Sequence, residues 1–150
     1  MKKQIFVLGL LSCLLLGCEK VVKPVYDINI TFNDDLDKSP KDGRLLLMLS
    51  TDNSDEPRFQ INAGLNTQII FGLNVDDWEP NTPITFNAST FGYPYASLKD
   101  VPPGEYHVQA LLNVYETFNL STGHTVKLPM DNGEGQQWQL SPGNLYSKPF

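Results

Sequence analysis

Apolar and polar residues alternate with a period of two along most of the chain after residue 25. Such alternation predicts strands with one face buried and the other toward solvent. Residues 44–50 are instead almost entirely apolar, which is typical of a central strand covered on both faces. The segments expected to form strands are 26–32, 44–50, 68–75, 84–86, 106–114 and 125–130.

Polar segments rich in Gly, Pro, Asn and Asp separate these strands, as turns should. They span residues 33–43, 52–57, 76–83, 101–104, 131–135 and 141–144. No segment combines a period of 3.6 residues with helix-capping signals. The pattern therefore predicts an all-β fold, an antiparallel immunoglobulin-like β-sandwich of about six or seven strands, in one domain over residues 26–150.

Tyr106 stands at the start of the clearest predicted strand, directly after a proline-rich turn. Pro102 and Pro103 cannot lie inside a strand, because neither donates a backbone hydrogen bond. In immunoglobulin-like domains a tyrosine in this position bonds its hydroxyl back to the preceding corner. Tyr106 is the candidate for that role, and the alternative is an ordinary core tyrosine. His107 is expected on the polar face of the same strand.

The first residues of the chain have the composition of an export signal. Met1-Lys2-Lys3 is basic, and residues 5–16 are almost entirely apolar. That length matches the apolar core of a secretory signal and falls short of the ~20 residues of a spanning helix.

The end of this segment, Leu15-Leu16-Gly17-Cys18, resembles the lipobox of bacterial lipoproteins. The resemblance implies a cleaved signal peptide at 1–17, lipidation at Cys18 and a short tether over 18–25. It places the protein in the bacterial cell envelope, at the outer membrane in preference to the inner one. Two alternatives are a lipobox ending at Cys13 and a signal that carries no lipid.

The charge and the cysteine content of the part after the signal limit which ligands and which covalent or metal sites it can have. Without Lys2 and Lys3 it has nine basic and 17 acidic side chains, a net charge of −8. Such a balance argues against nucleic-acid binding, which needs clustered Lys and Arg. The negative charge also argues against electrostatic adhesion to anionic lipids. The acyl lipid on Cys18 is therefore the expected contact with the membrane. Both cysteines lie within residues 1–18, so no disulfide or thiolate metal site is expected after them.

Catalytic and metal-binding patterns are missing from the sequence. There is no Gly-x-Ser-x-Gly elbow or phosphate-binding glycine loop. The two histidines, His107 and His124, are expected at the surface, so no catalytic residue, cofactor or metal site is predicted. Calcium is an alternative for two acidic segments, although neither has EF-hand spacing. Their side chains are Asp34, Asp35, Asp37 and Asp42, then Asp52, Asp55 and Glu56.

Aromatic residues gather in turn-rich stretches and have two interpretations. They could stack on sugar rings, or they could close the ends of the sandwich or pack on a neighbouring domain. The candidates for stacking are Trp78, Tyr93, Tyr95 and Trp138, with Phe91 nearby.

A series of ordered motifs covers most of the chain after the signal. It comprises Gly43-Arg44-Leu45, Glu56-Pro57-Arg58, Val101-Pro102-Pro103-Gly104-Glu105-Tyr106-His107-Val108-Gln109-Ala110, Asn113-Val114-Tyr115, residues 123–131 and residues 141–147. The series resembles the N-terminal region of a family of exported bacterial esterases. In that family a β-sandwich precedes a larger α/β-hydrolase domain with the catalytic serine, acid and histidine. None of its catalytic motifs occurs here, so no catalytic residue is carried over.

The resulting hypothesis is a lipid-anchored, non-catalytic N-terminal module of an exported esterase-like hydrolase. The expected partners are the membrane, through the lipid, and a C-terminal hydrolase domain of the same chain. The sequence is then a fragment that stops at Phe150, or a stand-alone relative of the module. The alternative is a stand-alone envelope lipoprotein that binds glycan or protein partners.

Overall fold

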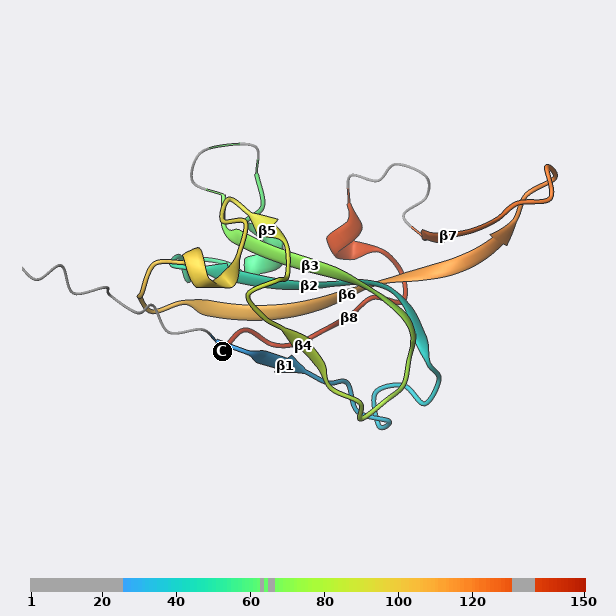
Figure 1. The fold of residues 1–150 in the computed structure, drawn as a ribbon, viewed down its shortest axis with the longest axis horizontal. Helices are drawn as coiled ribbons and strands as arrows, with labels where there is room; N and C mark the ends of the chain where they lie inside the picture. The colour runs from blue at the N-terminus through green and yellow to red at the C-terminus, as the bar shows by residue number, and fades with distance from the viewer. Residues whose placement is uncertain (1–25, 63, 65–66, 131–136) are drawn as a thin grey trace, which may run out of the picture.

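Two antiparallel β-sheets form the fold (Figure 1). The computed structural model describes residues 26–62, 64, 67–130 and 137–150, and within them eight strands and three short 3-10 turns. The strands are β1 Ile28–Ile30, β2 Lys41–Ser50, β3 Ile69–Trp78, β4 Ile84–Phe86, β5 Gly92–Tyr93, β6 His107–Asn119, β7 Thr125–Pro129 and β8 Leu145–Tyr146. The 3-10 turns are η1 Pro57–Phe59, η2 Leu98–Asp100 and η3 Trp138–Leu140.

The larger sheet has the strand order β5-β3-β2-β6-β7, and β8 also pairs with β6. The smaller sheet consists of β1 and β4 alone. Leu47 of β2 lies opposite Phe71 of β3 and Ala110 of β6, which makes β2 the central strand. The predictions of an all-β antiparallel sandwich and of a central strand at 44–50 are confirmed.

The hydrophobic core lies between the two sheets. We call the side of the large sheet that packs on β1 and β4 its inner face, and the opposite side its outer face. Leu45, Leu47 and Leu49 point inward from alternate positions of β2, as the period of a strand requires. They pack with Phe71 and Phe86, both fully buried. The alternating apolar residues therefore form one continuous core.

The outer face differs from the sequence prediction. The polar side of β6 was expected at the surface, yet the side chains of Gln109 and Asn113 are buried. Met48 of β2, which lies opposite Gln109, is fully buried as well. The turns η1 and η3 pack on this face and cover the part of it formed by β6 and the neighbouring part of β2. Alternation identifies two faces of a strand, but it does not show that a polar face will be covered.

The corner before β6 agrees with its prediction. The Tyr106 hydroxyl donates a hydrogen bond of 2.9 Å to the carbonyl oxygen of Pro102. Burial, and then the neighbouring Tyr95, raise the pKa of the Tyr106 hydroxyl. This bond ties the start of β6 to the turn that precedes it.

Strands β5 and β8 were not predicted. Each has two residues, which is too short for alternation to be recognised. Both are fixed by partners far away in the sequence, since Phe71 lies opposite Gly92 and Leu111 opposite Tyr146. The turn expected at 141–144 is present, with Gly143 at a positive φ of 81°. The turn expected at 131–135 lies outside the described residues.

Candidate functional site

The four aromatic residues singled out in the sequence do not form one row. The Trp78 side chain is buried in the core, packed edge-to-face against Phe32 with ring centroids 4.8 Å apart. Its indole N–H donates to the carbonyl of Thr82 at 2.7 Å. Trp78 is therefore excluded from a stacking role, because neither ring face is available. Tyr95 is partly buried and packs against the same core.

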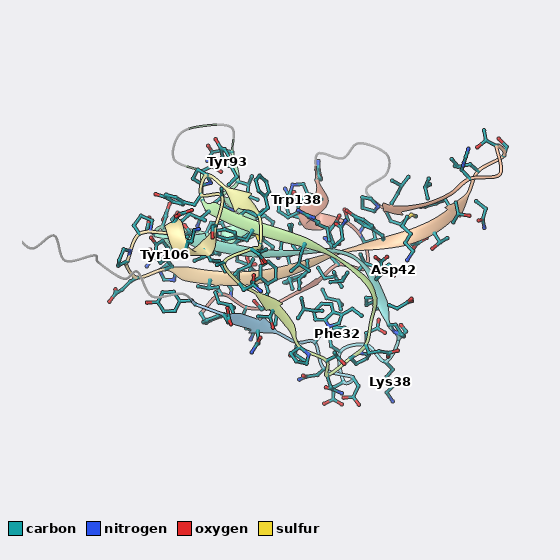
Figure 2. The ribbon with its side chains drawn as sticks, in the orientation of Figure 1. Phe32, Lys38, Asp42, Tyr93, Tyr106 and Trp138 are labelled. Atoms are coloured by element: carbon teal, nitrogen blue, oxygen red, sulfur yellow. The ribbon has the colours of Figure 1, made fainter. Side chains whose placement is uncertain are left out.

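Tyr93 and Trp138 lie on the outer-face side of the large sheet, away from Phe32 (Figure 2). The Tyr93 side chain is 60% exposed, whereas Trp138 is half-buried. Of the four predicted residues, Tyr93 alone presents most of its side chain to solvent. The structure thus supports the packing interpretation for Trp78 and Tyr95, and leaves Tyr93 as the residue around which a surface site can be built.

Phe91, directly before β5, and Tyr93 of β5 project to the same side, because Gly92 between them faces the core. A Cβ atom on Gly92 would lie 2.3 Å from a ring carbon of Phe71, so no side chain fits there. Successive residues of a strand point to opposite faces. The two aromatic side chains, 69% and 60% exposed, consequently share the outer face.

The guanidinium of Arg44, from β2, lies over Gly72, the residue bonded to Phe91. A Cβ atom on Gly72 would lie 2.9 Å from Arg44 Nε, so the guanidinium extends across Gly72. The N–H of Gly72 in turn donates to the carbonyl of Phe91 at 3.1 Å. Arg44 Nη1 donates to Asn74 Oδ1 at 3.0 Å. Among the described residues, no carboxylate lies within ion-pairing distance of Arg44.

A polar network occupies the outer face on the β6 side. Arg58 of η1 holds its guanidinium between the rings of Phe59 and Tyr146, 4.4 and 3.7 Å from their centroids. Its Nε lies 2.8 Å from Glu56 Oε2. Gln109 accepts a bond from the Arg58 backbone N–H and donates to Glu56 and to the Ser147 carbonyl. We call this set of residues the Arg58 network.

The Arg58 network affects the titration of Glu56. The hydrogen bond from Gln109, followed by the charge of Arg58, lowers the pKa of the Glu56 carboxyl. Glu56 is therefore an anion at neutral pH and unsuited to donate a proton. The arrangement is that of a structural ion pair.

Two asparagines hold η3 against β6. Asn113 Nδ2 donates to the Trp138 carbonyl and to Asn144 Oδ1, at 3.2 and 3.1 Å. Asn144 Nδ2 donates to the same Trp138 carbonyl at 2.6 Å, and Asn144 Oδ1 also accepts from the Val114 N–H. These bonds fix the backbone of Trp138 beside β6.

The acidic segments engage neighbouring protein groups. Asp37 contacts Lys41 at 2.6 Å, and Asp42 contacts Lys127 at 2.9 Å. The backbone N–H of Ser54 donates to Asp52. Within the described ranges, His, Asp and Glu side chains form no group of three or more with the geometry of a metal site. The calcium alternative gains no support from this geometry.

The two histidines lie far apart. His107 begins β6 and is half-buried, while His124 is exposed in the turn after Asn119 at the other end of β6. Twelve residues of strand separate the two sites by ~40 Å. They cannot act on one substrate atom together.

A hollow of about 430 Å³ opens between the two sheets beside β8. Its lining is mostly apolar and includes Phe32, Leu36, Leu112 and Leu145. Of the described residues that line it, Asp35 and Tyr146 carry titratable side chains.

The proposed lipidation residue, Cys18, lies outside the described residues. Within them, the structure has no helix long and apolar enough to cross a membrane. Comparisons with protein-family models, curated proteins and solved structures found no match to this chain.

Proposed function

We propose that this chain is the lipid-anchored, non-catalytic N-terminal β-sandwich module of an exported esterase-like hydrolase. The observation that carries the proposal is that stretches far apart in the sequence meet in the folded chain. Three of the stretches that resemble the esterase family, at 56–58, 101–110 and 141–147, contribute side chains or backbone groups to the single Arg58 network.

The members of this network depend on one another. The Gln109 side chain is fully buried, and a buried amide that loses its partners costs about 1–3 kcal/mol. Its partners are Arg58, Glu56 and Ser147, which are 51, 53 and 38 residues away in the sequence. Because Gln109 needs all of these partners, the residues of the network are expected to occur together in chains that share this fold. The meeting of three resembling stretches in one network is the feature that supports the proposal.

Both ends of the described chain lie near Val108. Tyr26 and Ile28 line a hollow together with Val108. Phe150 exchanges two backbone hydrogen bonds with Val108, of 3.0 and 3.2 Å, and lies beside the start of β1 in Figure 1. A domain following residue 150 would therefore be attached near the point where the tether enters. Residues 18–25 span at most ~28 Å when extended. The module would then hold the hydrolase close to its membrane.

The test is the size and activity of the native protein. Antibodies against this chain would recover it from detergent-solubilised membranes of the source cell. We expect a polypeptide several times larger than residues 18–150, labelled by a fluorophosphonate probe that reacts with catalytic serines. As the control, the sample is first treated with a serine esterase inhibitor, which should abolish the labelling. A mass equal to lipidated residues 18–150, with no label, would contradict the proposal.

A further inference from the structure

We infer that the outer face at Arg44, Phe91 and Tyr93 is a binding site for a neutral glycan. This inference does not depend on the proposed function, since the site lies wholly within the described chain. We call these three residues the β5 site. It uses groups that neither the core nor the Arg58 network employs.

The aromatic part of the β5 site is held in place by the core. Gly92 presses on Phe71, which is fully buried, so β5 cannot rotate without opening the core. Phe91, directly before β5, and Tyr93 are two residues apart, which separates them by ~6.6 Å when the backbone is extended. Two exposed rings on a rigid edge strand offer apolar area with little loss of conformational entropy on binding. The faces of pyranose rings, which consist of C–H groups, are suited to such surfaces.

The polar part of the β5 site comes from Arg44. A guanidinium has five N–H donors, and the bond to Asn74 uses one of them. The absence of a side chain at Gly72 lets the guanidinium lie over this residue, whose backbone N–H donates to Phe91. Donors beside an aromatic pair can bond sugar hydroxyls while the rings stack. A glycan satisfies both requirements, whereas an apolar chain would leave the donors without acceptors.

The charges indicate a neutral ligand. Asp42 and Asp76 lie on the strands that carry Arg44 and Asn74, and both are bonded to Lys127. This group holds two carboxylates and one ammonium, and the whole chain carries a net charge of −6. Repulsion of a polyanion by these acids opposes the attraction of Arg44. A neutral hexose or pentose polymer meets no such repulsion.

The experiment is a binding measurement on the full chain as extracted in detergent. Hexasaccharides of β-glucan, mannan and xylan would be titrated by isothermal calorimetry, with a galacturonate hexamer as the anionic comparison. We expect at least one neutral hexasaccharide to bind. Phe91→Ala and Tyr93→Ala should each weaken it about tenfold, the effect of losing one stacked ring. Arg44→Met should weaken it as well.

Tyr26→Ala provides the matched control. Tyr26 is 61% exposed, almost as Tyr93 is, but it lies outside the β5 site, before β1. Its variant should bind as the wild type does, and circular dichroism would verify that every variant is folded. The inference is overturned if no neutral hexasaccharide binds at millimolar concentration. It is also overturned if the galacturonate binds more tightly, or if Tyr26→Ala weakens binding as much as Tyr93→Ala.

Discussion

Glycines 72 and 92 decide where the side chains of the proposed β5 site lie, although they contribute no side chain themselves. A glycine within a strand pattern signals a bulge or a close approach. At Gly92 the close approach is the ring of Phe71, and at Gly72 it is the guanidinium of Arg44. The sequence shows the two glycines and so indicates a close approach. Only the register of the neighbouring strands shows which side chain approaches each of them.

Tyr106 gives a test at the level of one hydrogen bond. Tyr106→Phe keeps the ring and removes the bond to Pro102, so we expect the free energy of unfolding to fall by about 1 kcal/mol. Urea unfolding followed by tryptophan fluorescence measures it. Tyr93→Phe is the control, because its exposed side chain should make the same change nearly neutral. Equal effects of the two variants would show that the corner bond contributes nothing.

At the scale of elements, the pairing of β2 with β6 leaves no room at Gly43. A Cβ atom there would lie 2.3 Å from the backbone carbonyl oxygen of Asn113. The backbone of a central strand cannot move aside without loss of ladder bonds. Gly43→Ala should therefore destabilise the protein by about 1–3 kcal/mol, as overpacking does.

Gly104→Ala is the matched control for Gly43→Ala. The nearest atom to its new Cβ would be 3.4 Å away on the Tyr106 ring, an ordinary contact. Thermal unfolding should place the Gly43 variant several degrees below the Gly104 variant. Similar midpoints for both variants would contradict the close approach of β2 and β6.

Beyond the backbone ladder of β2 and β6, Lys127 of β7 links its strand to β2 and β3 through two ion pairs. Lys127 Nζ lies 2.9 Å from both Asp42 Oδ2 and Asp76 Oδ1. The bond from Lys127, and then the backbone N–H of Asp77, lower the pKa of the Asp42 carboxyl below its ordinary value of about 4. The ion pair thus contributes stability above pH ~4, and this contribution is lost as the pH falls through the lowered pKa.

Lys127→Met tests this connection. We expect the pKa of Asp42, measured by carboxyl carbon NMR, to rise toward its ordinary value but not to reach it. The bond from Asp77 to Asp42 remains in the variant. The difference in stability between wild type and variant should be present at pH 7 and shrink below pH ~4. Lys38→Met, at an exposed lysine, should leave the Asp42 titration unchanged.

At the scale of the whole molecule, the two sheets differ greatly in extent. The large sheet supplies the inner face for the core and an outer face covered only in part, by η1 and η3. The uncovered part carries the β5 site. A face of this kind can bind a ligand without disturbing the core.

The anchor is tested by one substitution at the start of the molecule. Cys18→Ser removes the thiol that the proposed lipid requires, so the variant should move from the detergent-extracted membrane fraction to the soluble envelope fraction. Cys13→Ser should stay with the membrane. Fractionation followed by immunoblotting measures both. Membrane retention of the Cys18 variant, or release of the Cys13 variant, would refute lipidation at Cys18.

Particular residues show how far the sequence could be interpreted. Alternation over 106–114 correctly placed Val108 and Leu112 toward the core, and the proline-rich turn correctly marked Tyr106 as the corner. Trp78 was placed among exposed candidates because its surroundings are turn-rich. Its ring is buried because the strand β3 extends to it and Phe32 covers it. Such contacts join residues that are distant in the sequence.

The sequence by itself determined the class of fold, the central strand and the corner, because these follow from local periodicity and from the backbone chemistry of proline and glycine. The tertiary structure alone decided that Gln109 and Asn113 are buried, that Arg58 lies between two rings, and that Arg44 lies over Gly72. These outcomes depend on strand order and register. Both are set by the packing of the whole chain, which no local pattern encodes.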